Sequence, residues 1–272
     1  MASGGWMGRR TLLATLRGVA RRRTEILGYH GVSERSEHDL HNLLVAPSSF
    51  RAQIELLLEA GFEFVTVESL AVEVHAGEIA PGRIALSFDD GMEDNHHIVL
   101  PILREYGIPG TFYVATGLLG LPNPFLPGGA RMMTEDELRE IASQGVEIGA
   151  HTVTHPDLST LGYEECLSEM NGSREALEAL LGRPAMTFAY PFCRYGPEAI
   201  AAARDAGFSV AVTCKPGGWK PYELGRSMIS SLDSLGRLAL KLTGIFEPIA
   251  IRHRALKGAQ APRRPPPTDP PA

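Results

Sequence analysis

Apolar and polar positions along this chain follow a regular order of short strands and amphipathic helices. Short apolar, β-prone runs precede stretches with helical spacing, and each run has the length of a buried strand. These runs cover residues 26–30, 64–67, 83–88, 111–114, 146–150, 186–190 and 208–213. Strand–helix units repeated about seven times predict a parallel sheet, and this many units in one domain favour an α/β fold with barrel-like closure.

Capping and breaking residues indicate where the helices lie. Thr134 and Glu137 form a capping-box pattern at the start of one helix. Pro101 interrupts another helical stretch, so we expect a kink there or a helix that starts near the proline. Residues 163–181 are amphipathic over a long stretch, with an expected interruption at Asn171 and the glycine after it.

The length of 272 residues suits one large α/β domain with tails. We expect a basic N-terminal leader over residues 1–25 and a barrel domain over residues 26–245. A basic and then proline-rich tail over residues 246–272 cannot form a core and is expected to be disordered.

The leader surrounds a short apolar run, residues 12–16, with arginines. The run is too short for a membrane span, and no convincing cleavage site follows it, so we predict no secretory signal and a cytoplasmic location. Two interpretations stay open, a solvated basic leader and a basic amphipathic helix that lies on an anionic membrane surface. The arginines are Arg9, Arg10, Arg17, Arg21, Arg22 and Arg23.

Charge and cysteine content exclude some classes of protein. The net charge of −6 and the pI near 5.9 show no overall basic footprint, so we expect no nucleic-acid partner. Cys166, Cys193 and Cys214 are scattered, odd in number and without CxxC spacing. They predict neither a disulfide framework nor a structural zinc site, and a reducing compartment is the simpler interpretation. The oligomeric state is not determined by the sequence.

Two motifs that can carry chemistry follow apolar runs. Asp89 and Asp90 come directly after the run 83–88, and two adjacent buried carboxylates need a cation beside them. His151 and His155 follow a later run, four residues apart. Two imidazoles and one carboxylate can hold a divalent metal with positions left open, and the second aspartate can then act as a base. Alone, each motif is also consistent with a turn or a structural histidine, but their shared position at strand ends favours a metal site.

Other polar residues are placed by the same argument. His30 and Tyr190 also end predicted strands, and in a barrel the carboxyl ends of the strands surround one mouth. Residues 117–131 are rich in Gly and Pro and predict a long loop of the kind that covers a site. His96 and His97 fall on a predicted helix and are interpreted as surface or structural residues.

Over roughly residues 25–230 the chain resembles the polysaccharide deacetylases, the NodB-like carbohydrate esterases of family four. Residues 87–91, Ser-Phe-Asp-Asp-Gly, stand where that family has Thr-Phe-Asp-Asp-Gly. Residues 151–155 match its His-(Ser/Thr)-x-x-His motif, and Tyr-Pro-Phe at residues 190–192 is similar to a third motif. The resemblance implies a distorted (β/α)7 barrel and metal-dependent removal of acyl groups from an N-acylated sugar.

The resemblance also implies roles for individual residues. Asp89 would be the general base, while Asp90, His151 and His155 would hold the metal. Zinc is the expected ion, with cobalt or nickel as alternatives. The main-chain N–H of Tyr190 would help to hold the oxyanion.

The general acid is where the sequence departs from this family's common pattern. Many members supply it from a Leu-x-His motif near the C-terminus, whereas here only His253 in the tail follows the second motif. Some members that act on exopolysaccharide look circularly permuted, and in a closed barrel the first strand neighbours the last, so we expect His30 to be the acid; a structural histidine is the alternative. Arg226 stands near the missing motif and would either pair with Asp89 and keep it ionised or form a plain surface ion pair. Cys193 stands where relatives often have glycine, and we interpret it as a small residue.

Three functions remain open from the sequence. The first is a metal-dependent hydrolase that removes N-acyl, above all N-acetyl, groups from a glycan or glycan precursor. The second is an amide hydrolase that acts on a non-polymeric substrate, such as a formamido sugar or a small cyclic amide. The third is a non-catalytic carbohydrate-binding protein on the same barrel, against which the intact Asp89–Asp90 pair argues.

Overall fold

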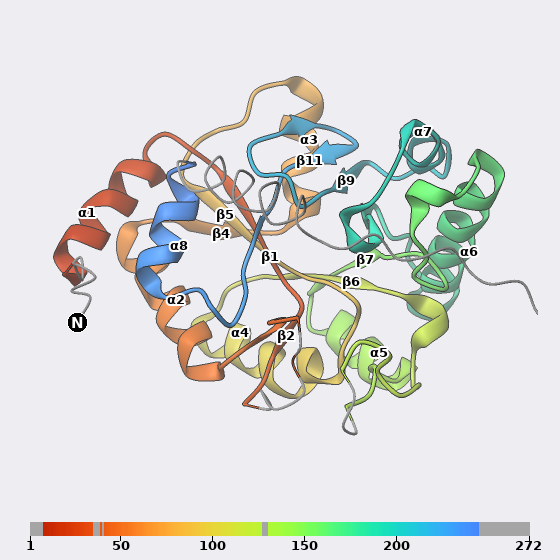
Figure 1. Ribbon diagram of the computed structural model, residues 1–272, viewed down its shortest axis with the longest axis horizontal. Helices are drawn as coiled ribbons and strands as arrows, with labels where there is room; N and C mark the ends of the chain where they lie inside the picture. The colour runs from red at the N-terminus through yellow and green to blue at the C-terminus, as the bar shows by residue number, and fades with distance from the viewer. Residues whose placement is uncertain (1–7, 35–38, 40, 127–129, 245–272) are drawn as a thin grey trace, which may run out of the picture.

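A computed structural model of the chain describes residues 8–34, 39, 41–126 and 130–244 (Figure 1). The tail expected over residues 246–272, with His253, and residues 127–129 of the expected loop lie outside the described residues. The strands are β1 (Glu25–Tyr29), β2 (Gly31–Val32), β3 (Leu44–Val45), β4 (Glu63–Val65), β5 (Arg83–Phe88), β6 (Thr111–Val114), β7 (Glu147–Ala150), β8 (Thr187–Ala189), β9 (Val210–Val212), β10 (Trp219–Lys220), β11 (Glu223–Leu224) and β12 (Ser227–Met228). The α-helices are α1 (Arg9–Ala20), α2 (Pro47–Ala60), α3 (Val67–Ala76), α4 (Leu100–Tyr106), α5 (Glu135–Ser143), α6 (Tyr163–Leu181), α7 (Pro197–Asp205) and α8 (Leu235–Leu242). Shorter helical segments are the π-helix η1 (Asn95–Val99) and the 3₁₀ turns η2 (Thr116–Leu118), η3 (Leu158–Thr160) and η4 (Pro191–Cys193).

The main sheet is curled, and its strands run in the order β10-β11-β9-β8-β7-β6-β5-β1-β12, with β4 paired to β5 off this path. All pairings are parallel except β10 with β11. Leu224 pairs with β9, while Ser227 and Met228 pair with β1. The short segment from β11 to β12 therefore bridges the two ends of the curled sheet, and helices surround it (Figure 1). The expected α/β barrel is confirmed in this distorted form.

Alternation along β5 decides which side chains face the inside of the sheet. Leu86 and Phe88 belong to the large apolar cluster that includes the outer helices. Ala85 belongs to a second cluster on the inner side. Successive residues of a strand point to opposite faces, so Ser87 and Asp89 follow Ala85 to the inside.

The amino-terminal end of the barrel is closed by α3 and a buried polar group. Glu147, at the start of β7, accepts hydrogen bonds from the Thr111 and Thr187 hydroxyls and from the backbone N–H of Glu68. Burial raises the pKa of Glu147, although these bonds oppose the shift. Apolar residues of α3 pack beside it on inward residues of the strands, namely Ile26, Ala85, Tyr113, Val210 and Val212. Among the described residues of the barrel, the carboxyl ends of the strands are therefore where we look for a site inside the sheet.

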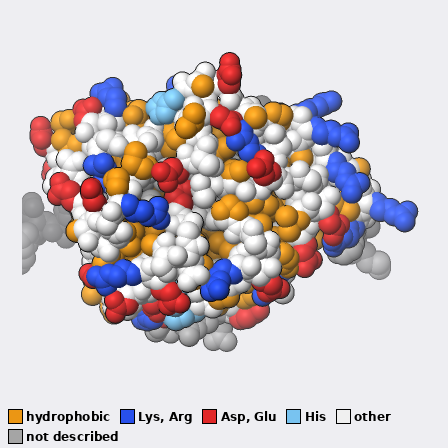
Figure 2. All heavy atoms as spheres, turned by 180° about the vertical axis from the view of Figure 1, so that it is seen from behind, with side chains coloured by type: hydrophobic (Ala, Val, Ile, Leu, Met, Phe, Trp, Pro, Cys, Tyr) orange, Lys and Arg blue, Asp and Glu red, His pale blue; other side chains and the backbone are white. Residues whose placement is uncertain are grey.

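The segment expected to be a solvated basic leader forms α1 and packs on α2 and α8. Leu12, Leu16 and Val19 are buried, so the apolar side of this helix is covered by the protein's own helices. Figure 1 shows α1 at the left of the molecule, and Lys and Arg side chains gather at the right edge of Figure 2, which views the molecule from behind. None of the described helices is long and apolar enough to cross a bilayer.

Two expectations about helices have different outcomes. Pro101 stands at the second position of α4, which begins at Leu100, so the predicted helix start near this proline is confirmed. The predicted interruption at Asn171 is wrong, because α6 runs unbroken through it. A Cβ on Gly172 would lie 3.0 Å from Cγ2 of Val153. The glycine therefore permits close packing of the histidine-motif loop on α6 rather than ending the helix.

Candidate functional site

The candidate site is built from turns that follow the carboxyl ends of β5 and β7. Asp90 has a φ of 73° directly after Asp89, and Thr152 and His155 have φ values of 69° and 60°. Non-glycine residues rarely adopt this left-handed conformation, and such strain concentrates at functional sites because the surrounding structure must hold it. Glu169 of α6 supports the second turn by accepting hydrogen bonds from the backbone N–H groups of Val153 and Thr154.

Asp90, His151 and His155 converge on one point, as predicted from the sequence. Oδ1 of Asp90 lies 3.4 Å from Nε2 of His151 and 3.2 Å from Nε2 of His155. His151 donates from Nδ1 to the carbonyl oxygen of Ala189 at 2.7 Å, so its Nε2 carries the lone pair in the neutral ring. Around a tetrahedral ion with bonds of about 2.0–2.1 Å, neighbouring ligand atoms lie about 3.3 Å apart. The three side chains therefore fit a divalent metal.

The environment of His155 suits a neutral metal ligand. Burial lowers the pKa of His155, and the carboxylate of Asp90 opposes the shift only in part. Phe125 and Phe192 flank the imidazole, with ring centroids 4.7 Å and 4.5 Å away. Phe192 is 54% exposed, so it presents an aromatic edge at the mouth of the site. Its position in the Tyr-Pro-Phe motif was the signal that could have identified it from the sequence.

Both carboxylate oxygens of Asp89 face Arg226. The guanidinium donates from Nη1 to Oδ1 at 2.6 Å and from Nη2 to Oδ2 at 2.7 Å. Burial raises the pKa of Asp89, but the charge and hydrogen bonds of Arg226 more than offset this and hold the pKa below its usual value. Of the two interpretations of Arg226, pairing with Asp89 is confirmed, and the pair is buried rather than on the surface.

Several contacts of Arg226 could not be predicted from the sequence. Nη1 also donates to the hydroxyl of Ser87 at 3.1 Å, and Nε donates to the carbonyl of Thr213 at 3.1 Å. Its Cζ lies 5.7 Å from the ring centroid of Tyr113. A Cβ on Gly149 would lie 2.4 Å from that ring, so only glycine fits there. These residues come from separate strands, and no local pattern joins them.

His30 and Tyr190 are placed differently by the structure. His30 directly follows β1 and is partly buried. Burial raises the pKa of Asp89 and of Asp90, and the charge of His30 is among the effects that lower both. The backbone N–H of Tyr190 donates to the carbonyl of Val212 at 3.4 Å, near the limit for such a bond. Its phenol reaches the carbonyl of Tyr222, away from the metal ligands. The oxyanion role of Tyr190 remains a prediction that requires this long bond to open.

The expectation that the scattered cysteines form no disulfide is wrong. Cys193 and Cys214 form a disulfide, with Cα atoms 5.6 Å apart, and Cys166 is buried and free. The bond ties the Tyr-Pro-Phe turn to the segment after β9, so Cys193 is more than a small residue. It also removes the argument for a reducing compartment.

A family model described as polysaccharide deacetylase matches residues 76–211, half of the chain, which contain both aspartates and both histidines. The chain belongs to the polysaccharide deacetylase family. Its metal-ligand candidates therefore come from within the matched polysaccharide deacetylase region, whereas His30 and Arg226 lie outside it.

Individual relatives agree with this assignment. The chain is 26% identical over 193 residues to the putative polysaccharide deacetylase YxkH of Bacillus subtilis, covering 71% of this chain and 64% of that protein. It is 24% identical over 225 residues to a poly-beta-1,6-N-acetyl-D-glucosamine N-deacetylase of Staphylococcus aureus, covering 78% of this chain and 76% of that one. The Streptococcus pyogenes deacetylase PplD, solved in complex with acetate, superposes with a TM-score of 0.71 at 28% identity, covering 80% of this chain and 97% of that chain.

Proposed function

We propose that this chain is a metal-dependent hydrolase that removes N-acyl groups, above all N-acetyl groups, from a glycan or glycan precursor. One observation supports this more than any other. Two adjacent aspartates at the end of β5 have different partners, Asp90 two imidazoles and Asp89 a guanidinium. One carboxylate is thus available to a metal and the other to a proton, which amide hydrolysis with an activated water requires.

A divalent ion held by Asp90, His151 and His155 would polarise the amide carbonyl and acidify a water molecule. Asp89 is ionised at neutral pH because Arg226 lowers its pKa against the effect of burial. Each carboxylate oxygen has two lone pairs, so Asp89 can hold Arg226 and still accept a proton from water. We propose Zn²⁺ as the ion, with Co²⁺ or Ni²⁺ as substitutes in vitro.

The departing amine needs a proton, and we propose that His30 donates it. His30 follows β1, which pairs with both β5 and β12, so it lies beside the strand that carries Asp89. A protonated imidazole is a suitable donor near neutral pH. The N–H of Tyr190 is the proposed oxyanion donor once its long bond to Val212 opens.

The proposed substrate is an N-acetylated sugar rather than a small amide. Phe192 is exposed beside His155, and an aromatic surface of this kind can pack against the apolar face of a sugar ring. The Staphylococcus aureus relative is named for poly-beta-1,6-N-acetyl-D-glucosamine, which makes that polymer the first substrate to test. A formamido sugar is the second, because the same site could hydrolyse a formamide.

The test is release of acid from defined substrates. The chain is stripped of metal with a chelator, reloaded with Zn²⁺, Co²⁺ or Ni²⁺, and incubated with N-acetylglucosamine oligomers and formamido sugars while acetate and formate are measured. The proposal expects acetate release that needs added metal and falls by about two to four orders of magnitude in Asp89→Asn. Activity that the chelator does not change, or binding of the oligomers without release of acid by any metal-loaded form, would overturn it.

Peripheral membrane contact remains a proposal that rests on charge alone, since the apolar side of α1 is buried. Arg10, Arg17 and Arg21 are exposed and could face anionic lipids. The parent should float with anionic vesicles, whereas the variant with these three arginines changed to glutamate should not. Equal flotation of parent and variant would contradict membrane contact through α1. A cytoplasmic location stays a separate proposal that the Cys193–Cys214 bond does not support, and fractionation of cells tests it.

A further inference from the structure

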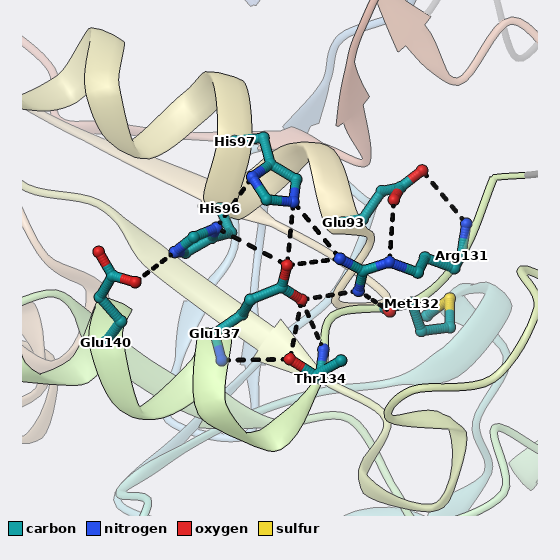
Figure 3. Close-up of polar contacts among 8 residues, drawn as sticks. All are labelled: Glu93, His96, His97, Arg131, Met132, Thr134, Glu137 and Glu140. Carbon is teal, nitrogen blue, oxygen red and sulfur yellow. Dashed lines mark hydrogen bonds and ion pairs between the residues drawn. The ribbon is translucent and has the colours of Figure 1, made fainter.

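A second group of histidines lies outside the site described above, on the π-helix η1 and the facing helix α5 (Figure 3). His96 and His97 belong to η1, and Glu137 and Glu140 belong to α5. One possible ligand atom each from His96, His97 and Glu137 lies within 4.8 Å of the other two. π-Helical segments occur often at functional sites, which is a reason to ask what these side chains bind.

The hydrogen bonds of the two imidazoles determine where their lone pairs lie. Nε2 of His96 lies 3.0 Å from Oε2 of Glu140, and Nε2 of His97 lies 2.9 Å from Oε1 of Glu137. Nη2 of Arg131 also approaches Nε2 of His97, at 3.4 Å, so the carboxylate of Glu137 is the nearer partner. Because an ionised carboxylate only accepts hydrogen bonds, each neutral ring then carries its proton on Nε2. Both Nδ1 atoms then present lone pairs, and these atoms are only 3.1 Å apart. Two facing lone pairs at this distance repel each other unless a proton or a metal ion lies between them.

We propose that His96 and His97 bind a divalent transition-metal ion through their Nδ1 atoms, with water in the remaining coordination positions. The 3.1 Å between the two nitrogens is close to the separation of about 3.3 Å expected for ligands on one tetrahedral zinc. Glu137 is not counted as a ligand, because Arg131, the backbone N–H of Thr134 and Nε2 of His97 already hold its oxygens. Two imidazole nitrogens suit Zn²⁺, Ni²⁺ or Cu²⁺.

Glu140 has the position of an orienting group rather than a ligand. Metal-binding histidines commonly donate their other ring N–H to a carboxylate, which fixes the ring and makes the ligand nitrogen more basic. The contact of Glu140 with Nε2 of His96 has this arrangement. The same two helices therefore supply both the proposed ligands and an orienting partner.

The charges around the site favour a cation. Glu137 pairs with Arg131 through both carboxylate oxygens, and Glu93 pairs with the same guanidinium at 3.2 Å. The hydrogen bond from Arg131 lowers the pKa of Glu137 to about 2, so this carboxylate is ionised at neutral pH. Three carboxylates lie here, those of Glu93, Glu137 and Glu140. They outnumber the two guanidinium groups, that of Arg131 and that of Arg104 at the edge of the site.

The remaining coordination positions are open to water. His96, His97 and Glu140 line a surface hollow of about 400 Å³ together with Leu100, Pro101 and Arg104. The side chain of His97 is 50% exposed, so an ion can reach it from solvent. No ligand is shared with the Asp90 site, so loss of this ion leaves the proposed hydrolysis intact.

The test counts metal ions per full-length chain. Chelator-stripped protein is dialysed against micromolar Zn²⁺ or Ni²⁺, and bound metal is measured by mass spectrometry. We expect two ions in the parent, one in His96→Ala/His97→Ala, one in His151→Ala/His155→Ala, and two in His75→Ala, which removes an exposed histidine elsewhere. A single ion in the parent, or two ions in the His96/His97 variant, would overturn the proposal. If the two rings share a proton instead of a metal ion, the parent should bind a single ion.

A milder variant guards against loss of folding. Glu140→Gln keeps both ligands and most of the size of the side chain, so α5 should remain intact in circular dichroism. If Glu140 orients His96, calorimetric titration with Zn²⁺ should show affinity at this site weaker by about 10–100-fold, the usual effect of losing such a partner. Unchanged affinity in this variant would contradict the proposed geometry.

Discussion

Arg226 and Asp89 form a buried, two-bond ion pair that joins the segment bridging the ends of the sheet to the end of β5. Arg226 is fully buried between β11 and β12, and it holds Asp89 by both carboxylate oxygens. The pair thus has two consequences, one for the stability of the barrel and one for the ionisation of the proposed base.

Replacing Arg226 by alanine should lower the free energy of unfolding by about 3–5 kcal/mol, because a buried carboxylate is left without its partner. Urea unfolding measures this. Arg226→Ala/Asp89→Asn should recover part of the loss while remaining inactive, since the uncompensated charge is removed but the base is not restored. Additive losses in this double-mutant cycle would show that the two side chains do not act as a pair.

The adjacent aspartates should separate metal binding from catalysis. Asp89→Asn should retain the metal and lose turnover by about two to four orders of magnitude, the usual range for a general base. Asp90→Asn should lose both, because its Oδ1 faces the two imidazoles. Metal content and acetate release are measured on the same samples. Equal metal content in the two variants would refute this division.

His30→Ala should bind metal normally and lose most of its turnover on an amide, because the amine then leaves without a proton donor. An aryl ester needs little help to expel its leaving group, so its hydrolysis should fall much less. The ratio of the two rates is the measurement, with His75→Ala as the control. An unchanged rate on amides would exclude His30 as the acid.

Glu25 should make the stability depend on pH. Burial raises the pKa of Glu25 from its ordinary 4.5 to about 7, against the opposing effect of Arg23. The folded chain therefore holds this proton more tightly, and the associated stability is fully present below about pH 4.5 and lost by about pH 7. Relative to Glu25→Gln, the parent should lose up to about 3 kcal/mol across that window, at about 1.36 kcal/mol per pKa unit.

The free energy of unfolding of both proteins, followed by urea titration from pH 4 to pH 8, tests this, with Glu63→Gln as an exposed control on β4. Parallel profiles for parent and Glu25→Gln would exclude the linkage. If the free energy of unfolding of the parent rose with pH relative to that of Glu25→Gln, the linkage would have the opposite sign to the one expected.

The Cys193–Cys214 bond can be counted directly. In the denatured, unreduced chain one thiol, that of Cys166, should react with a thiol reagent, and all three cysteines should react after reduction. Cys214→Ser should lower the free energy of unfolding by about 2–4 kcal/mol through loss of the cross-link. Three reactive thiols without reductant would exclude the bond, whereas Cys166→Ala should leave it intact.

The parallel sheet and the convergence of the candidate metal ligands could be predicted because their causes are local. Apolar runs of strand length separated by amphipathic helices already require a parallel sheet, and parallel strands bring their carboxyl ends together. Asp90, His151 and His155 each follow such a run directly, so their convergence needs no information beyond the chain order. The same reasoning placed His30 and Asp89 at strand ends around one mouth, whereas the pairing of their strands, β1 with β5, is known from the structure.

The tertiary structure decided the contacts between residues that are far apart in the chain. The choice between a buried and a surface pair for Arg226 depended on the bridging segment from β11 to β12, which is too short and irregular to show strand periodicity. The unbroken α6 depended on Val153 packing against Gly172, and the Cys193–Cys214 bond depended on how two separate turns meet. The burial of α1 on α2 and α8 followed from helix packing. In each case the determining energy comes from close contact and exclusion of water, which local residue pattern does not encode.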